Sequence, residues 1–217
     1  KKYQMPADKM YLPVHVGAEG KKDSDGKDLD LGYVKDNTGD NISLKNPSFC
    51  ELTGLYWAWK NVDSDYIGLA HYRRHFSLNK KSKDPFDNIL TYDELAPLLS
   101  KYKVFVPKKR KYYIETLYSH YAHTHYAEHL DVTKEIIAEK YPEYTDSCNK
   151  VYKQTYGYMF NMMIMRKNLF QNYCEWLFNI LFELEKRIGE SSKELSFFQG
   201  RFYGRVSEII FNVWLDY

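Results

Sequence analysis

Residues 67–76 read IGLAHYRRHF, an apolar run followed without a spacer by two histidines and two arginines. Turn-forming residues, Asp63-Ser64-Asp65, stand just before it. This pattern predicts a buried strand of a sheet that is covered on both faces. The polar groups then lie at the carboxyl end of that strand, which is where ligands bind in open α/β sheets.

The charged end of this stretch favours an anionic ligand. Arg73 and Arg74 carry guanidinium forks that pair well with phosphate oxygens, and His71 and His75 add hydrogen-bonding groups. The alternative is that the arginines form a solvated strand end or an internal ion pair. Because charges that follow a buried strand are paired or functional, we favour the ligand site.

Composition narrows the class of protein. The 217 residues are 44% hydrophobic and 28% charged, which is typical of a folded chain, and we expect one domain over residues 1–217. A net charge of +2 gives no reason to expect nucleic acid as a partner. Three widely spaced cysteines indicate reduced thiols in a cytoplasmic protein, and no run of 18 apolar residues predicts a membrane span.

Periodicity predicts helices and strands along the chain. Asn46 and Pro47 supply a cap and a first position for one helix, and Thr91 with Glu94 forms a capping box for another. The expected helices cover residues 46–61, 92–101, 115–130, 133–141, 168–188 and 201–215. The expected strands cover residues 11–16, 67–70, 102–106 and 156–165.

Three polar residues within the expected helices and strands are candidates for a functional site. Asn161 lies inside the apolar run 156–165, where it is either a satisfied core amide or a site residue. Glu208 stands in an apolar helix and is a candidate base, or simply the i, i+3 ion-pair partner of Arg205. Glu51, near a helix start, favours the helix dipole or faces a site.

Two motifs raise the question of a metal. Asp63-Ser64-Asp65 has the D-x-D form of a divalent-cation motif but stands at the entrance of the strand, so a turn is favoured over a metal site. His125 and His129 are four residues apart and would share a helix face, but the H-E-x-x-H frame of a zinc site is missing. We expect that face to bind sugar hydroxyls.

A basic run, Lys108, Lys109, Arg110 and Lys111, follows the expected strand 102–106. It is either a solvated loop or a basic patch for phosphate or for an anionic membrane surface. The second interpretation predicts peripheral contact with the inner face of a plasma membrane.

Long motifs carry a resemblance to a known family. They are GDNIS at 39–43, NPSFCELTGLYWAWKN at 46–61, DYIGLAHYRRHF at 65–76, and MFNMMIM with YCEWLF at 159–178. With them the chain resembles a bacterial glycosyltransferase family of capsular polysaccharide, exopolysaccharide and O-antigen gene clusters. Many members are described only as a domain of unknown function, and some are similar to galactofuranosyltransferases.

The resemblance implies a GT-A-like, Rossmann-like mixed α/β sheet flanked by helices. Such proteins normally begin with a strand that ends in a Thr-His-Lys-Lys-Tyr-like sequence, and this chain starts at that Lys-Lys, so we expect the first strand to be missing from it. The implied donor is a nucleotide sugar, a UDP-hexose such as UDP-galactofuranose, with a divalent manganese or magnesium ion left open. The implied acceptor is a glycan or a lipid-linked oligosaccharide.

The resemblance also implies the roles of individual residues. Glu208 or Asp40 would remove the acceptor proton, His71 would act beside them, and any metal would have Asp63 and Asp65 as its candidates. The implied substrate-binding residues are Asn41, Glu51, Arg73, Arg74 and Asn161. The competing hypothesis is a non-catalytic carbohydrate-binding or assembly subunit of the same pathway.

Overall fold

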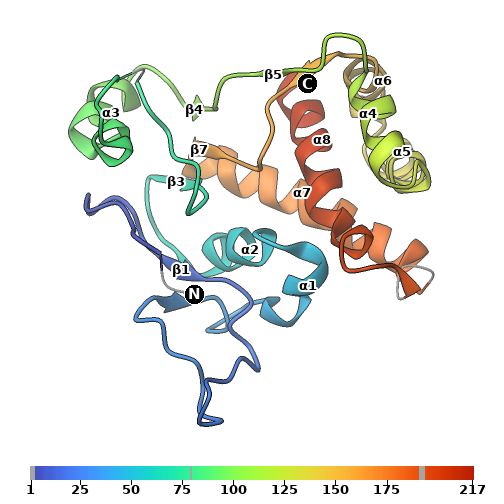
Figure 1. The fold of residues 1–217 in the computed structure, drawn as a ribbon. Helices are drawn as coiled ribbons and strands as arrows, with labels where there is room; N and C mark the ends of the chain where they lie inside the picture. The colour runs from blue at the N-terminus through green and yellow to red at the C-terminus, as the bar shows by residue number, and fades with distance from the viewer. Residues whose placement is uncertain (1–2, 79, 191–193) are drawn as a thin grey trace.

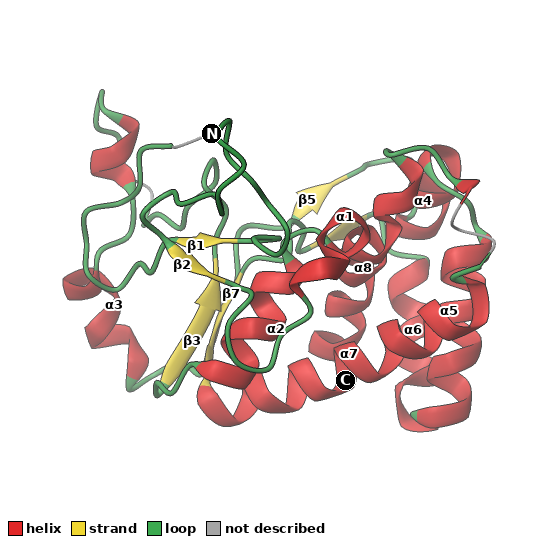
Figure 2. Ribbon diagram, turned by 90° about the horizontal axis from the view of Figure 1, so that it is seen from below, coloured by secondary structure: helices red, strands yellow, loops and turns green. Residues whose placement is uncertain are grey.

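The computed structural model describes residues 3–78, 80–190 and 194–217. Its longer helices gather around a central helix, and two of the three small sheets lie toward the other side (Figures 1 and 2). The third sheet, formed by residues 110–111 and 156–157, lies near the last helix. The helices are α1 (Asn46–Phe49), α2 (Leu52–Asn61), α3 (Tyr92–Leu99), α4 (Leu117–Thr124), α5 (Glu128–Lys140), α6 (Thr145–Tyr152), α7 (Lys167–Ile188) and α8 (Phe202–Asp216). The strands are β1 (Val14–His15), β2 (Val34–Lys35), β3 (Tyr66–Leu69), β4 (Val104–Phe105), β5 (Arg110–Lys111), β6 (Tyr156–Gly157) and β7 (Met163–Arg166).

The principal sheet of the described residues is antiparallel and has the order β3-β7-β4. Of the four residues of β3 only Ile67 is buried, so the expectation of a strand covered on both faces is wrong. Among the described residues β3 lies at the edge of the sheet and pairs with β7 alone, so one of its sides is not covered by a neighbouring strand. The predicted mixed α/β class is nevertheless correct.

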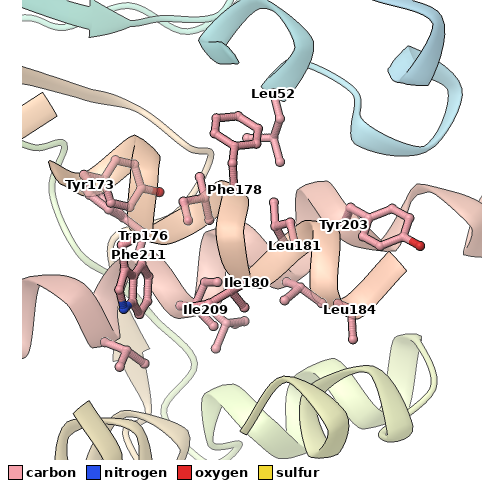
Figure 3. Close-up of a cluster of buried hydrophobic side chains, with 14 of the residues drawn as sticks. Leu52, Tyr173, Trp176, Phe178, Ile180, Leu181, Leu184, Tyr203, Ile209 and Phe211 are labelled. Atoms are coloured by element: carbon pink, nitrogen blue, oxygen red, sulfur yellow. The ribbon is translucent and has the colours of Figure 1, made fainter. Parts of the chain in front are cut away.

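The core is built around α7. Its side chains Tyr173, Leu177 and Leu181 are fully buried, and Figure 3 shows apolar side chains of α2 and α8 gathered around this helix. Apolar residues recur every three to four positions through its 22 residues, so one long stripe leaves water. The sequence prediction of a helix over 168–188 is confirmed, as is the last helix, α8.

Several expected elements are divided by tight turns. The helix expected over 46–61 breaks at Cys50, which has a φ of 54°, and the helix expected over 115–130 breaks at His125, whose backbone is extended. The strand expected over 156–165 becomes β6 and β7, with a turn over 158–162 between them. Phe160 and Asn161 have φ values of 74° and 50° in this turn, a conformation that no ladder residue adopts.

No helix of the described ranges is both long enough and apolar enough to pass through a bilayer.

Candidate functional site

Polar side chains from separate segments meet at the turn between β6 and β7. The Asn161 amide donates to Oε1 of Glu51 at 2.8 Å and to the carbonyl of Gly204 at 3.0 Å. His71 comes from the turn that follows β3, and its Nε2 lies 3.0 Å from the carbonyl of Phe160. The carboxyl of Glu208 accepts from the backbone N–H of Phe160. Four of the residues predicted from the sequence, Glu51, His71, Asn161 and Glu208, therefore belong to one cluster, which we call the 160–161 cluster.

The geometry indicates which ring nitrogen of His71 donates. A carbonyl can only accept, so Nε2 of His71 carries the proton that bonds Phe160, and in the neutral ring Nδ1 is then the acceptor. Oε1 of Glu51 lies 3.7 Å from the same Nε2. The side chains of His71 and Glu51 are each about one-fifth exposed, so a ligand can reach them.

Asn161 is buried but incompletely bonded. It adopts a left-handed backbone conformation, which asparagine tolerates better than most residues. Its amide nitrogen has two acceptors, yet its Oδ1 is buried with no hydrogen-bond partner among the described residues. Buried carbonyl oxygens rarely lack a donor, so Oδ1 is an unsatisfied acceptor beneath the surface of the cluster.

Glu208 lies on α8, one helical turn after Gly204, and is 7% exposed. Burial is the main cause that raises the pKa of its carboxyl to about 7, and the charge of Glu51 contributes to the same rise. Arg205, the backbone N–H of Phe160 and Arg74 act in the opposite direction. A carboxyl that titrates near neutral pH can take up a proton during a reaction.

The arginines differ in their positions. Arg74 stacks on the ring of Phe160 at 4.3 Å and is close enough to Glu208 to lower the pKa of its carboxyl. Arg73 lies over the ring of Tyr72 at 5.0 Å, and both arginines are exposed. The ion pair predicted between Arg205 and Glu208 is present at 3.5 Å and coexists with the raised pKa of Glu208.

Two predicted residues lie elsewhere. Asp40 accepts from the Tyr56 hydroxyl at 3.1 Å, and its backbone carbonyl accepts from Asn61, the last residue of α2. Glu51 precedes the first residue of α2, so Asp40 and the 160–161 cluster lie at opposite ends of that helix. Asn41 caps the short turn that follows, accepting from the Ser43 N–H at 3.1 Å. We therefore place neither residue with Glu208, and we assign Asn41 a structural role.

The two aspartates of the D-x-D motif are not gathered into a metal site. Asp63 forms an ion pair with Lys167 at 2.5 Å, and its side chain is 88% exposed. In residues 3–78, 80–190 and 194–217 there is no group of three or more His, Cys, Asp or Glu side chains placed to hold a metal ion. No step proposed below depends on these aspartates.

The histidine face expected on residues 115–130 is not available to sugars. His125 and His129 are buried, and the ring of His129 stacks on Phe202 at 3.9 Å. Burial lowers the pKa of His129 to about 4, so the ring is neutral and serves the core. The cause is the break at His125, which separates the two residues into different helices.

Sequence reasoning missed Asp36, which is fully buried at the end of β2. Its carboxylate accepts from the N–H groups of Gly17 and Ala18 and from the hydroxyls of Ser43 and Thr53, at 2.6–3.0 Å. These bonds fasten the N-terminal segment to α2, just after Glu51. No local pattern distinguished Asp36 from the neighbouring turn residues, since its donors come from three distant segments.

The chain matches one family model and is similar to a solved structure. A family model described as a domain of unknown function, DUF4422, matches residues 1–217. The solved structure titled "WbbM bifunctional glycosytransferase apo structure" is similar with a TM-score of 0.88 and 30% identity, over 100% of this chain. This chain spans 40% of the length of that one. The similarity confirms the GT-A-like fold expected from the sequence, and no curated protein gave a significant match.

Proposed function

Since the chain belongs to the DUF4422 family, we propose that residues 1–217 form one glycosyltransferase domain that acts at the 160–161 cluster. The similar solved structure is titled a bifunctional glycosyltransferase, and the full cover of this chain supports the same reaction class. The observation that carries the proposal is the convergence of Glu51, His71, Asn161 and Glu208 from four segments, with Glu208 poised to exchange a proton near pH 7.

We propose a nucleotide sugar as the donor, a UDP-hexose such as UDP-galactofuranose. Its diphosphate would be held by Arg74 and Arg73 at the end of β3, where guanidinium groups offset the charge that develops on the leaving group. The exposed sides of His71 and Glu51 would orient sugar hydroxyls, and the buried amide of Asn161 would hold Glu51 in position for this. A divalent ion bound through the donor phosphates is compatible with this arrangement.

The proposed step uses one carboxylate. The acceptor hydroxyl oxygen bonds to the anomeric carbon, the bond from that carbon to the diphosphate oxygen breaks, and the hydroxyl proton passes to Glu208. Because the pKa of Glu208 is about 7, a sizeable fraction is ionised at neutral pH and still basic enough to accept a proton. We propose that the acceptor is a glycan or a lipid-linked oligosaccharide of bacterial surface polysaccharide synthesis, and that the enzyme is cytoplasmic.

The test separates catalysis from binding. Thermal shifts of the intact protein with UDP-, GDP- and CMP-sugars, with and without manganese, identify the donor, because a ligand of the native state raises the melting temperature. Release of the nucleoside diphosphate is then measured with candidate acceptor glycans. We expect Glu208→Gln to keep the thermal shift and lose turnover, while Glu128→Gln on the exposed start of α5 keeps both.

The alternative function is a non-catalytic carbohydrate-binding subunit. Its signature would be a thermal shift with glycan alone and no release of nucleoside diphosphate from any donor. Undiminished turnover in Arg73→Ala/Arg74→Ala would remove both arginines from the mechanism.

A further inference from the structure

Two large apolar side chains stand next to each other on the surface between β5 and α4. Ile114 is 93% exposed and Tyr113 is 82% exposed. Tyr113 has a φ of 61°, and the N–H of Ile114 donates to the carbonyl of Tyr112 at 2.7 Å, which makes a tight turn centred on Tyr113. Both ribbon views place this segment at the periphery of the molecule (Figures 1 and 2).

The positive φ of Tyr113 strains the backbone at a turn whose side chains are exposed and apolar. A positive φ is uncommon for an aromatic residue, and strained turns persist where the surrounding structure or a function requires them. Here the strain directs the side chains of Tyr113 and Ile114, which we call the 113–114 tip, into solvent. An exposed apolar tip of this kind indicates a surface that meets an apolar partner.

The chemistry next to the tip is cationic. The basic run Lys108–Lys111 leads directly into the turn, and all four of its residues are exposed. The ammonium of Lys109 lies 4.6 Å from the ring of Tyr156, and the guanidinium of Arg110 lies 5.1 Å from that of Tyr112, so aromatic rings orient these charges.

The acidic residue nearest to the tip in sequence is bonded to histidines. Both carboxylate oxygens of Glu115 are engaged by histidines, Oε2 by Nδ1 of His120 at 2.6 Å and Oε1 by Nδ1 of His123 at 2.5 Å. The surface therefore combines an apolar projection with a run of exposed lysine and arginine side chains.

We propose that this surface docks on an anionic membrane, with the 113–114 tip in the interfacial layer and the basic run on the headgroups. A tyrosine beside an aliphatic side chain suits the boundary between water and acyl chains, and lysine and arginine are attracted to anionic lipids. A free phosphate ligand would gain nothing from Ile114. A stable protein partner needs roughly 800 Å² of buried surface on each side, far more than two side chains supply.

The docking surface is linked to the 160–161 cluster through the ladder of β5 and β6. β5 pairs with β6 through Arg110 and Gly157, and β6 runs directly into the turn that holds Phe160 and Asn161. The charge of Glu208 is also felt at the hydroxyl of Tyr112, the residue before the tip. The membrane proposal goes beyond sugar transfer and does not depend on it, because binding is measured without any substrate.

The test is co-flotation of the intact protein with vesicles of phosphatidylcholine alone or mixed with phosphatidylglycerol. We expect binding to the anionic vesicles that weakens with added salt, since salt screens exposed charges. The variant Tyr113→Asn/Ile114→Ser keeps a residue that tolerates positive φ and should lose most binding, whereas Ile114→Trp should retain it. The matched control is Leu44→Ser, which removes an apolar side chain that is 75% exposed on another surface.

Charge is tested separately with Arg110→Gln/Lys111→Gln, for which we expect about fivefold weaker binding per cation near an anionic surface. The proposal is overturned by equal binding to neutral vesicles, by no binding, or by an equal loss in Leu44→Ser. Self-association that disappears in Tyr113→Asn/Ile114→Ser, measured by sedimentation velocity, would instead assign the tip to a contact between protein copies. Unchanged circular dichroism of each variant shows that a loss of binding is not a loss of fold.

Discussion

Glu208→Gln should make the protein more stable at alkaline pH while it removes activity. The wild-type carboxyl is buried on α8, and its pKa rises from 4.5 to about 7 because burial disfavours the ionised form. Glutamine has nearly the shape of the protonated carboxyl and can still accept from the N–H of Phe160. The variant therefore keeps the packing and loses only the buried charge.

The sign and size follow from proton binding. Between pH 4.5 and 7 the folded protein holds a proton on Glu208 that the unfolded chain has released, so raising the pH favours unfolding. The contribution is fully lost above pH 7. At about 1.4 kcal/mol for each pH unit in this interval, ionising Glu208 lowers the free energy of unfolding by on the order of 3 kcal/mol.

Urea unfolding curves measured from pH 4 to pH 9 test this expectation. The quantity of interest is the free energy of unfolding of Glu208→Gln minus that of the wild type, because other titrating groups largely cancel in the difference. The difference should rise between pH 4.5 and 7 and then level off. Glu128→Gln, on the exposed start of α5, controls for the exchange of a carboxylate for an amide.

Activity should move in the opposite direction. The wild-type rate of transfer should increase with pH through about 7 as Glu208 ionises, and Glu208→Gln should be slower by roughly 10²–10⁴-fold. A stability difference that is flat with pH would refute the buried titration. A normal rate in a well-folded Glu208→Gln protein would refute the assignment of the base.

Three further outcomes are expected from the same geometry. Arg74→Ala should weaken donor binding more than Arg73→Ala, because only Arg74 adjoins Phe160 and Glu208, and titration calorimetry with the donor measures the difference. Asp36→Ala should lower the free energy of unfolding by about 3 kcal/mol or more, since it leaves several buried donors without an acceptor; a loss under about 1 kcal/mol in urea unfolding would contradict this. Asn161→Ala should lower the free energy of unfolding by about 1–3 kcal/mol and slow sugar transfer, because it removes two amide hydrogen bonds and a residue that tolerates the left-handed backbone conformation. Urea unfolding at the wild-type free energy would show that those hydrogen bonds do not stabilise the fold.

Local sequence patterns predicted the elements that local physics controls. The 3.6-residue repeat identified α7 and α8, because a helix with one long apolar stripe must bury it. The Thr91–Glu94 capping box placed the start of α3, since both of its hydrogen bonds lie within four residues. The run IGLAHYRRHF placed His71 and Arg74 after a strand, as the structure has them.

Tertiary structure alone decided which of these groups meet. Asn161 was expected inside a strand, but the turn at Phe160 and Asn161 frees its amide to reach Glu51, 110 residues away in the sequence. Asp40 looked equivalent to other acidic candidates, yet it lies at the opposite end of α2. The sequence by itself determined the long helices, the end of β3 and the polar residues that are candidates for the site, because those depend on neighbours along the chain. The selection among the candidates depended on long-range contacts and burial, which no local pattern encodes.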